Sequence, residues 1–430
     1  MKTKTITVSP LARIEGEAGL RLRLRNDTVT GVELNVFEPP RFFEAFLRGR
    51  RFDEVPDIVA RICGICPIAH QLTAIHALER ACGVQVDAAV AALRRLIYLG
   101  EWIESHALHI YLLHAPDFLG TQDAIQLAAT HAPVVERALR LKKIGNEIMR
   151  IVGGREIHPI NLKVGGFYRL PARGEVSHLA ADLRWAKDAA VETVRFAASL
   201  PVPDFELDFN CVSLREPDRY PLLDGRVIST GGLDIQPSEY EEHFEEEHVE
   251  RSNALHSSSS SQLPYIVGPL ARFNLNADRL RPAARAAAAE AGLQPPCRNP
   301  FRSIVVRSVE LVNACEEALA LVEAYDKPGA PSVSVTPRAG RAGAWSEAPR
   351  GLLYHRYSID SRGLVLDAKI VPPSAQNQRV MERDLGRFAA GHLHLPEPEL
   401  TLRCEQAIRN YDPCISCATH FLTLTITQDQ

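Results

Sequence analysis

Two Cys-x-x-Cys pairs stand near opposite ends of this 430-residue chain. Arg-Ile-Cys-Gly-Ile-Cys contributes Cys63 and Cys66, and Asp-Pro-Cys-Ile-Ser-Cys contributes Cys414 and Cys417. The x-x spacing lets both sulfur atoms of a pair face one metal ion, and four thiolates that meet in a fold make a soft-metal site. Because the second pair lies almost at the C-terminus, the fold must bring the two ends of the chain together around the metal.

The residues beside each pair favour thiolate ligands. Cys66 precedes Pro67, which can open a helix whose N-terminal dipole stabilises a thiolate, and Pro413 stiffens the loop before Cys414. Four thiolates alone suit zinc or a single iron. Zinc ribbons usually place their pairs about 15 to 20 residues apart, whereas most of this chain separates the two pairs. A structural zinc site therefore stays open as an alternative.

The other five cysteines stand alone. A total of nine cysteines, odd and thinly spread, does not indicate a disulfide framework. We expect each isolated cysteine to be a small buried hydrophobe; these are Cys82, Cys211, Cys297, Cys315 and Cys404.

The bulk composition bounds the class of protein. An apolar content of 46% allows a sizeable core, and a net charge of -4 gives no reason to expect nucleic acid or anionic lipid as partner. No stretch is long and apolar enough to span a bilayer, and the N-terminus lacks the apolar block of a secretory signal. We therefore expect a cytoplasmic protein with no nucleic-acid partner and no membrane span.

The hydrophobic pattern begins as β and then becomes helical. Strict alternation on both sides of an Asn-Asp turn predicts a hairpin or small sheet over residues 3–37. Helices follow, including a long one that Pro116 is expected to end; a set of this length indicates a bundle. The predicted helices cover residues 42–47, 67–81, 87–113, 133–152, 176–199, 282–291, 304–325, 376–389 and 396–408.

The remaining segments are less regular. The acidic run 239–250 predicts a solvated helix, the serine run 257–261 a flexible loop, and residues 351–371 alternate as strands do. No Gly-x-Gly-x-x-Gly or Walker loop is present, so we expect no dinucleotide site in this chain. The prediction is one α+β domain over residues 1–430, mostly helical, with a central bundle of long helices and small peripheral β-sheets. It comprises a sheet at 1–37, a helical core with β insertions at 38–420 and an extension at 421–430.

Taken together, these motifs resemble the large, catalytic subunit of nickel-iron hydrogenases, nearly end to end. The resemblance rests on both cysteine motifs, the second continuing as Ala-Thr-His, on Arg-Ile-Glu-Gly-Glu from residue 13 and on Glu-Ala-Pro-Arg-Gly from residue 347. The related large subunit of respiratory complex I shares the fold without these cysteines. A non-catalytic coupling subunit of that type is a second alternative.

The resemblance implies a role for each cysteine. Cys63 and Cys414 would be terminal ligands of nickel, and Cys66 and Cys417 would bridge nickel to an iron that carries one CO and two cyanide ligands. Soft thiolates suit nickel. The implied activity is reversible, heterolytic oxidation of H2.

The resemblance also implies three catalytic side chains. Glu15 would be the first station of the proton path beside a terminal cysteine, although the residues alone read as a surface acid on a turn. Arg350 would stand over the open metal site, paired with Asp412. The alternative without a catalytic role is that the Pro-Arg-Gly sequence only forms a tight turn into a strand.

Three further residues would line the cofactor. His70 would donate a hydrogen bond to the sulfur of a bridging cysteine, Ser374 would hydrogen-bond a cyanide, and Pro349 would adjoin the same group. From the pattern alone, a helical histidine such as His70 is more often a satisfied core residue.

A magnesium ion is the second implied metal. Glu44 would supply a carboxylate ligand and His420 a second ligand near the C-terminus, although histidine is atypical for magnesium. His106, His109 and His114 share a predicted helix but no clean common face, so we expect packing or hydrogen bonding from them rather than a further metal site.

Departures from the membrane-linked pattern point to a subclass. Ser105 stands where many membrane-linked relatives carry Asp, which puts one polar contact to Arg350 in doubt. The Glu-Ser-His sequence around Ser105, the Pro-Arg-Phe-Phe-Glu sequence at 40–44 and the compact length are more similar to soluble hydrogenases linked to NAD(P) or another soluble carrier.

The resemblance implies partner chains as well. The chain has no spare cysteine cluster, so an iron-sulfur small subunit is required, and flavin- and NAD(P)-binding diaphorase-type subunits would supply FAD and NAD(P). Nickel-insertion proteins and a maturation endopeptidase would act on the precursor. Ten residues follow His420, and we expect the mature chain to end at that histidine.

Overall fold

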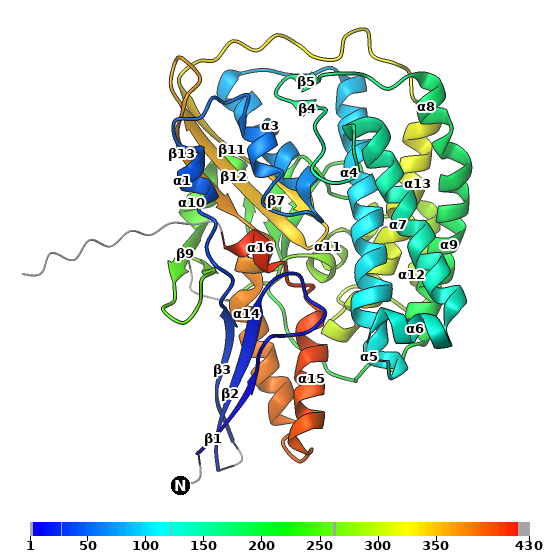
Figure 1. The fold of residues 1–430 in the computed structure, drawn as a ribbon, viewed down its shortest axis with the longest axis vertical. Coiled ribbons are helices and arrows are strands. Elements are labelled where there is room, and N and C mark those ends of the chain that lie inside the picture. The colour runs from blue at the N-terminus through cyan, green and yellow to red at the C-terminus, as the bar shows by residue number, and fades with distance from the viewer. Residues whose placement is uncertain (1–2, 27, 122, 261–263, 420–430) are drawn as a thin grey trace, which may run out of the picture.

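Four long helices form a bundle on one side of the fold, at the right of the view in Figure 1. The structure is a computed structural model that describes residues 3–26, 28–121, 123–260 and 264–419. The bundle helices pack against one another, and α13 is buried on nearly every side along most of its length because its sequence is apolar almost all round. They are α4 (Ala88–Leu108), α7 (Ala132–Gly153), α9 (Leu179–Ser199) and α13 (Ser303–Glu323). The predicted mostly helical α+β class is confirmed.

Helix α4 begins as expected and ends differently. The Asp87 side chain accepts a hydrogen bond from the backbone N–H of Val90 at 2.8 Å and so caps the helix. The helical path then continues as a π-helical turn, η1 (His109–His114), and as α5 (Ala115–Leu119). The prediction that Pro116 ends the helix is wrong. Pro116 lies in the first turn of α5, where a missing N–H breaks no helical hydrogen bond.

The N-terminal residues form a three-stranded antiparallel sheet in the order β1-β2-β3. Its strands are β1 (Thr3–Val8), β2 (Ala18–Arg25) and β3 (Thr28–Val36), which confirms the predicted hairpin or small sheet. Figure 1 shows this sheet beside α14 (Pro373–Ala390) and α15 (Glu397–Arg409). Alternate residues of β2 are buried, and the sheet contacts these helices through β3 against α14 and β1 against α15.

A second antiparallel sheet covers α3 (Pro67–Cys82). Its strands are β11 (Gly340–Ala348), β12 (Gly351–Ile359) and β13 (Val365–Val371). Ala348 pairs with Gly351, so Pro349 and Arg350 form a two-residue turn at the tip of the hairpin. Because α3 starts directly after Cys66, this packing sets the hairpin tip beside the first cysteine pair.

The acidic and serine runs pair with each other as strands. They give α10 (Tyr240–His243), β9 (Phe244–His248) and β10 (Leu255–Ser259). The helix predicted over 239–250 is therefore present only at α10, and the flexible loop predicted for the serine run is wrong at residues 257–259. Buried Phe244 anchors one strand, and buried Ser257 bonds the Tyr265 hydroxyl at 2.8 Å. The hydroxyl and aromatic partners come from outside the runs, so composition alone did not reveal the pairing.

Short elements connect these layers. One hydrophobic core cluster includes residues from Ile6 to Ala418. The predicted division of the chain into three segments stays a prediction. Residues 421–430, the predicted extension, lie outside the described residues. Within the described ranges, no helix is long and apolar enough to cross a membrane. The remaining elements are α1 (Phe43–Leu47), α2 (Val55–Val59), α6 (Ala124–Thr130), β4 (Leu162–Lys163), β5 (Gly166–Phe167), α8 (Arg173–Ser177), β6 (Val212–Arg215), β7 (Arg226–Ser229), β8 (Asp234–Ile235), η2 (Pro237–Glu239), α11 (Pro269–Asn276), η3 (Ala277–Arg279), α12 (Pro282–Glu290), η4 (Pro300–Arg302) and α16 (Ile415–Ala418).

Candidate metal centre

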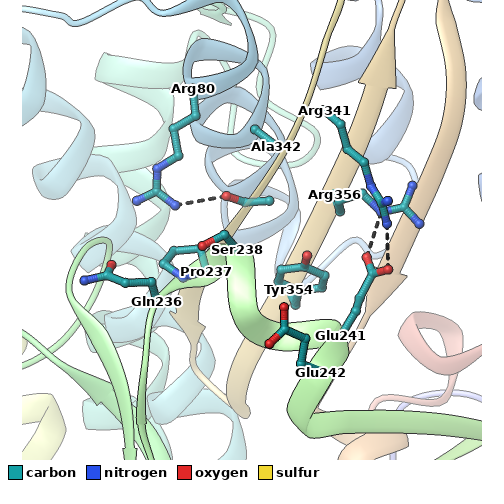
Figure 2. Close-up of a pocket in the computed structure, with 11 residues that line it drawn as sticks. Arg80, Gln236, Pro237, Ser238, Glu241, Glu242, Arg341, Ala342, Tyr354 and Arg356 are labelled. Atoms are coloured by element: carbon teal, nitrogen blue, oxygen red, sulfur yellow. Dashed lines mark hydrogen bonds and ion pairs between the residues drawn. The ribbon is translucent and has the colours of Figure 1, made fainter.

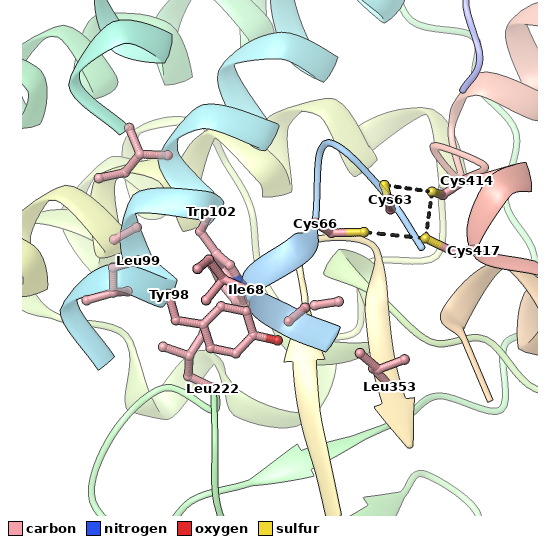
Figure 3. Close-up of a cluster of buried hydrophobic side chains, with 14 of the residues drawn as sticks. Cys63, Cys66, Ile68, Tyr98, Leu99, Trp102, Leu222, Leu353, Cys414 and Cys417 are labelled. Carbon is pink, nitrogen blue, oxygen red and sulfur yellow. Dashed lines mark hydrogen bonds between the residues drawn. The ribbon is translucent and has the colours of Figure 1, made fainter. Parts of the chain in front are cut away.

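The four cysteines of the two motifs meet in the core (Figure 3). The Sγ atoms of Cys63 and Cys414 lie 3.5 Å apart, those of Cys66 and Cys417 3.4 Å apart, and those of Cys414 and Cys417 2.8 Å apart. All four sulfurs lie within 4.8 Å of one another, and all four residues are buried. Among the described residues, no other group of three or more His, Cys, Asp or Glu side chains has this geometry.

Arg41 joins the two cysteine loops. Its Nη2 donates to the Ile62 carbonyl at 2.5 Å and also to the Ser416 carbonyl, and its backbone N–H donates to the Thr419 carbonyl at 2.7 Å. One residue between β3 and α1 therefore holds the segment before Cys63 against the segment around Cys417.

The N-terminal segment closes the site from a third direction. The backbone of Glu15 pairs with that of Cys414, and Ile415 donates its N–H to the Glu15 carbonyl at 3.0 Å. Gly16 has a φ of +86°, and a Cβ there would lie 2.6 Å from Ile415 Cβ. Only glycine fits this position, which explains the glycine of the Arg-Ile-Glu-Gly-Glu motif.

Glu101 fixes the start of α3. Its carboxylate accepts the backbone N–H groups of Ile68 at 2.6 Å and Ala69 at 3.2 Å, so an acid from α4 caps the helix that follows Cys66. Glu101 is fully buried, and burial raises its pKa well above the ordinary value. The cap holds the first cysteine pair at a fixed point of the bundle.

The four thiols differ in acidity. Hydrogen bonds from the neighbouring thiols, with that of Cys414 the strongest, hold the pKa of Cys63 well below its ordinary value. Burial raises the pKa of Cys414 and raises that of Cys417 to about 11. Four buried sulfurs within 4.8 Å of one another favour a bound cation, because a metal replaces the thiol protons.

Glu15 contacts the centre through its side chain. Its Oε2 lies 3.2 Å from Cys414 Sγ and accepts the backbone N–H of Ser416 at 3.0 Å. Burial, and then the charge on Cys63, raise the pKa of Glu15. A partly buried acid with a raised pKa beside a thiol is suited to accept a proton from that thiol.

Arg350 and Asp412 form a buried ion pair over the thiols. Arg350 Nη2 lies 3.2 Å from Asp412 Oδ1, and its Nε donates to the Asp412 carbonyl at 2.9 Å. Arg307 from α13 approaches the other carboxylate oxygen at 3.5 Å. Although burial alone would raise the pKa of Asp412, Arg350 and its other cationic neighbours lower it to about 2.

The predicted cofactor-lining residues lie in three settings. The Ser374 hydroxyl accepts the backbone N–H of Cys414 at 2.8 Å, which places it at the second cysteine pair. Pro349 is next to Arg350 at the hairpin tip. His70 Nδ1 lies 3.1 Å from His355 Nε2, and burial lowers the pKa of His70 to about 4. Its predicted contact with a cysteine sulfur stays a prediction.

Glu44 lies at the edge of the site beside a second acid. Its Oε1 accepts the backbone N–H of Ile370 at 2.7 Å. Burial, followed by the charge of Glu246, raises the pKa of Glu44 to about 8. Lys369 lies 3.6 Å from Glu246. His420, the other predicted magnesium ligand, lies outside the described residues.

The three histidines are buried, and two of them, His109 and His114, contact each other. His106 Nε2 lies 3.1 Å from Glu310 Oε2, and His109 bonds the Arg409 carbonyl at 2.8 Å. The ring of His114 packs against those of His109 and Phe118. These contacts agree with the expectation of packing and hydrogen bonding. Ser105 is buried, and its hydroxyl has no hydrogen-bond partner among the described residues.

The isolated cysteines and the surface pockets lie outside this centre. All five isolated cysteines are buried and reduced, as expected. A pocket of about 660 Å³ opens between α10 and the β11–β12 hairpin (Figure 2). Its charged residues pair within the fold, as Arg341 and Arg356 do with Glu241. Its lining includes none of the four clustered cysteines.

Sequence reasoning missed several residues that build the site. Their partners lie far away in the chain, so no local motif marks them. The only signal was an ionisable residue inside an otherwise apolar helical run, as at Leu-Gly-Glu-Trp around Glu101. The missed residues are Arg41, Glu101, Glu246, Arg272 and Arg307.

Comparison with known proteins places this geometry in one family. The sequence profile described as nickel-dependent hydrogenase matches residues 41–140. The alpha chain of sulfhydrogenase 1 from Pyrococcus furiosus is 34% identical over 423 residues, which cover 97% of this chain and 98% of that protein. The corresponding chain of the F420-non-reducing hydrogenase from Methanothermobacter marburgensis is 32% identical, and the match covers 96% of this chain and 94% of that protein.

A solved structure shares the whole fold. The crystal structure of an NAD+-reducing [NiFe]-hydrogenase in the H2-reduced state matches with a TM-score of 0.89 and 28% identity, covering 97% of this chain and 99% of that one. The beta chain of the NAD-reducing hydrogenase HoxS from Cupriavidus necator is also 28% identical, over 98% of this chain and 95% of its own length. With its four buried cysteines converging as the motifs predicted, the chain belongs to the nickel-dependent hydrogenase large-subunit family.

Proposed function

We propose that this chain is the catalytic subunit of a nickel-iron hydrogenase that oxidises H2 reversibly and passes the electrons through an iron-sulfur subunit to NAD(P). The observation that carries the proposal is the convergence of four buried cysteine sulfurs with an acid and an arginine-carboxylate pair in one place. A complex-I-type coupling subunit would need none of these thiols.

The donor set fits the metals of the family. Four sulfurs within 4.8 Å of one another form a soft and compact ligand set for nickel and iron. Cys63 and Cys414 would hold nickel as terminal ligands, and Cys66 and Cys417 would bridge it to an iron with one CO and two cyanide ligands. When bound, this centre supplies heterolytic cleavage of H2 and takes up the two electrons.

The polar residues divide the remaining tasks. Glu15 accepts the proton at Oε2, which is already within reach of Cys414 Sγ. Arg350, held by Asp412, presents a cation to the thiolates and to the cyanide ligands. Ser374 accepts a backbone N–H, so its own O–H remains able to donate to a cyanide, and Pro349 shapes the same wall.

An exposed apolar surface beside Cys63 is the proposed exit for electrons. Gly64 is exposed between the first two cysteines, and the nearest side chain to it is that of Ile157. Ile157 is 57% exposed, and Ile160, three residues further along the chain, is 49% exposed. Such a surface suits a permanent subunit. We assign it to the iron-sulfur subunit, because among the described residues the remaining cysteines form no cluster of their own.

The carrier is proposed to be NAD(P), reached through diaphorase-type subunits that hold FAD, in the cytoplasm. Similarity to an NAD+-reducing enzyme over the full length supports this carrier. The relatives also include a sulfhydrogenase and an F420-non-reducing hydrogenase. A test is to purify the native complex and to compare H2-dependent reduction of NADP+, NAD+ and F420. Reduction of neither nicotinamide would reject this part of the proposal.

Magnesium is proposed to bind at Glu44 and His420. The partly buried carboxyl group of Glu44 supports a divalent cation, because burial and the charge of Glu246 raise its pKa to about 8 and a positive ion would relieve both effects. Metal analysis of wild type and of Glu44→Gln tests the assignment. An unchanged magnesium content in the variant would contradict it.

We further propose that the mature chain ends at His420 after cleavage by a maturation endopeptidase once nickel has been inserted. An intact mass of the active chain should lack residues 421–430. Full-length mass in active enzyme would contradict the cleavage without affecting the assignment of the metal ligands.

The decisive experiment for the proposed function is an infrared spectrum of the anaerobically purified complex, paired with metal analysis. One CO band and two cyanide bands, with nickel and iron present, are expected. Zinc in place of nickel, with no such bands in a chain cut at His420, would establish a structural zinc protein and reject the enzyme.

A further inference from the structure

Arg350 lies at an unusual position for a residue whose guanidinium must point at the metal centre. It lies at the tip of the β11–β12 hairpin, in a two-residue turn, yet it is only 2% exposed. Its side chain contacts Asp412 on one side, at the distances given for the metal centre. The residues of a hairpin turn make no ladder hydrogen bonds to a neighbouring strand. The direction of the guanidinium therefore depends on side chains outside the hairpin that bind the backbone of the turn.

Arg272 of α11 holds that turn. Its Nη1 donates to the Ala348 carbonyl at 2.9 Å and its Nη2 to the Pro349 carbonyl at 2.8 Å. The residue before, Glu347, has its carbonyl bonded by Trp102 Nε1 at 2.9 Å. Three successive carbonyls leading into Arg350 therefore receive hydrogen bonds from side chains outside the hairpin.

Arg272 is itself fully constrained. Its Nε and Nη2 donate to the two oxygens of Glu310 at 2.7 and 2.8 Å, and its Nη1 also donates to Glu347 Oε2 at 3.0 Å. Its guanidinium lies 4.5 Å from the centre of the Trp102 ring. Five hydrogen bonds in a planar fork match the five N–H donors of arginine, and lysine has only three donors around one point.

The backbone of α11 contacts the same tip. Gly268, the residue before the helix, has a φ of +106°, and a Cβ there would lie 2.5 Å from the Arg350 carbonyl oxygen. Gly351 has a φ of +141°, and its Cβ would lie 2.8 Å from the Gly268 nitrogen. The start of α11 is thus packed against the turn, and Arg272, one turn further along the helix, locks the two together.

We propose that Arg272 is a positioning residue which fixes the aim of Arg350 at the metal centre through the Ala348–Pro349 backbone. The inference rests on the proposed function, because Arg350 matters only if the centre is loaded. Arg272 touches none of the four cysteines in the described contacts, so its effect on catalysis must pass through the turn. A displacement of about 1 Å at a catalytic group can cost about 100-fold in rate.

The test compares Arg272→Lys, Arg350→Lys and the double variant in the native complex. The control is Arg95→Lys, because Arg95 is an equally buried arginine that bonds Glu216, Glu317 and the Tyr220 carbonyl without touching the hairpin tip. The measurements are nickel content, kcat and KM for H2, the positions of the cyanide infrared bands and the melting temperature.

We expect R272K to lower kcat per nickel about 10- to 100-fold with KM changed less than about twofold, and to shift the cyanide bands. The control R95K should lower the melting temperature without shifting these bands. In the double variant, R272K should add no further loss to R350K, because both act through one group. The proposal would be overturned if the kcat losses of R272K and R350K multiplied in the double variant. It would also be overturned if R95K shifted the cyanide bands as much as R272K does.

A milder variant covers the case in which R272K does not fold. Glu310→Gln keeps the shape of the residue and weakens its hold on Arg272. It should shift the cyanide bands in the same direction by a smaller amount, and unshifted bands with a lowered melting temperature would reject the positioning role. A wild-type complex with nickel and the expected bands but no H2 consumption would instead reject the proposed function.

Discussion

Glu15 combines two properties that a proton-transfer group needs. It reaches a thiol through one oxygen, at 3.2 Å from Cys414 Sγ, and its pKa is raised by burial and by the charge on Cys63. The raised pKa makes this carboxyl group easier to protonate than an ordinary glutamate, and its partial burial leaves it a path for proton exchange.

The first prediction concerns this carboxyl group. Replacing it by an amide, Glu15→Gln, keeps the hydrogen bond from Ser416 and removes the proton exchange. We expect kcat for H2 oxidation to fall about 100-fold or more, with nickel content and infrared bands retained. Glu17→Gln, at an exposed residue two positions away, is the matched control. Activity of E15Q at the level of E17Q would show that protons leave by another group.

Glu347 gives a prediction for stability against pH. Burial raises its pKa from an ordinary 4.5 to about 7, and Arg272 only partly compensates. The folded chain therefore binds this proton more tightly than the unfolded chain, so the free energy of unfolding falls as pH rises from about 4.5 through 7. The loss is about 3 kcal/mol at most, at about 1.4 kcal/mol per pH unit.

Urea denaturation of the metal-free chain at several pH values checks this sign. Glu347→Gln should be less stable overall, because it weakens the bond to Arg272, and its free energy of unfolding should depend less on pH between about 5 and 7. An unchanged pH slope in E347Q would assign the titration to another buried acid.

The single residues of the site were predictable where the chain itself carries a short motif. The four cysteines, Glu15 and Arg350 stand in such motifs, and the structure brings all six together. The roles of Arg272 and Arg307 depend instead on contacts with residues that are distant in sequence. A buried arginine in an apolar helix gives no sign of its partners before the helices are packed.

At the scale of elements, close contact between α4 and α7 positions the helix cap of α3. Gly100 and Gly145 face each other across this contact, and a Cβ on Gly145 would lie 2.5 Å from the Gly100 carbonyl oxygen. Glu101, which caps α3, follows Gly100 directly. The small residues therefore set how deeply the capping acid reaches beneath the first cysteine pair.

The third prediction tests this contact. Gly145→Ala should push the helices apart and lower the free energy of unfolding by about 1–3 kcal/mol, as overpacking does. Gly174→Ala is the control, because nothing lies within 4 Å of a Cβ at that exposed position, and it should be neutral or slightly stabilising. Chemical denaturation of both variants is the measurement. Equal stability of the two would mean that the bundle relaxes without cost.

The elements themselves were predictable where periodicity is strong. The long bundle helices and the N-terminal sheet follow from spacing alone. The helix predicted for the acidic run is wrong beyond α10, because the following residues form β9 and pair with β10. The buried face of that pair depends on partners from other segments. The helix does not end before Pro116, because the π-helical turn η1 precedes it and Pro116 lies in the first turn of the next helix, α5.

At the scale of the whole molecule, the site is where the chain closes on itself. Arg41 ties the two cysteine loops through their backbone carbonyls, and Glu15 pairs with Cys414. Without a metal the four thiols would hold these ends weakly, because each thiol is a poor hydrogen-bond partner. The metal centre is therefore expected to contribute to the fold as well as to catalysis.

Hydrogen exchange measured by mass spectrometry gives the last prediction. Ligands that bind only the folded state stabilise what they join, so metal loading should slow exchange at residues 13–17 and 412–419. Exchange in α9, whose described contacts include neither the clustered cysteines nor residues 412–419, should be nearly equal in the loaded and metal-free chains and serves as the internal control. A loss of protection spread evenly over the bundle would mean that the metals support the whole core. No difference at either end would mean that Arg41 and Glu15 close the fold without them.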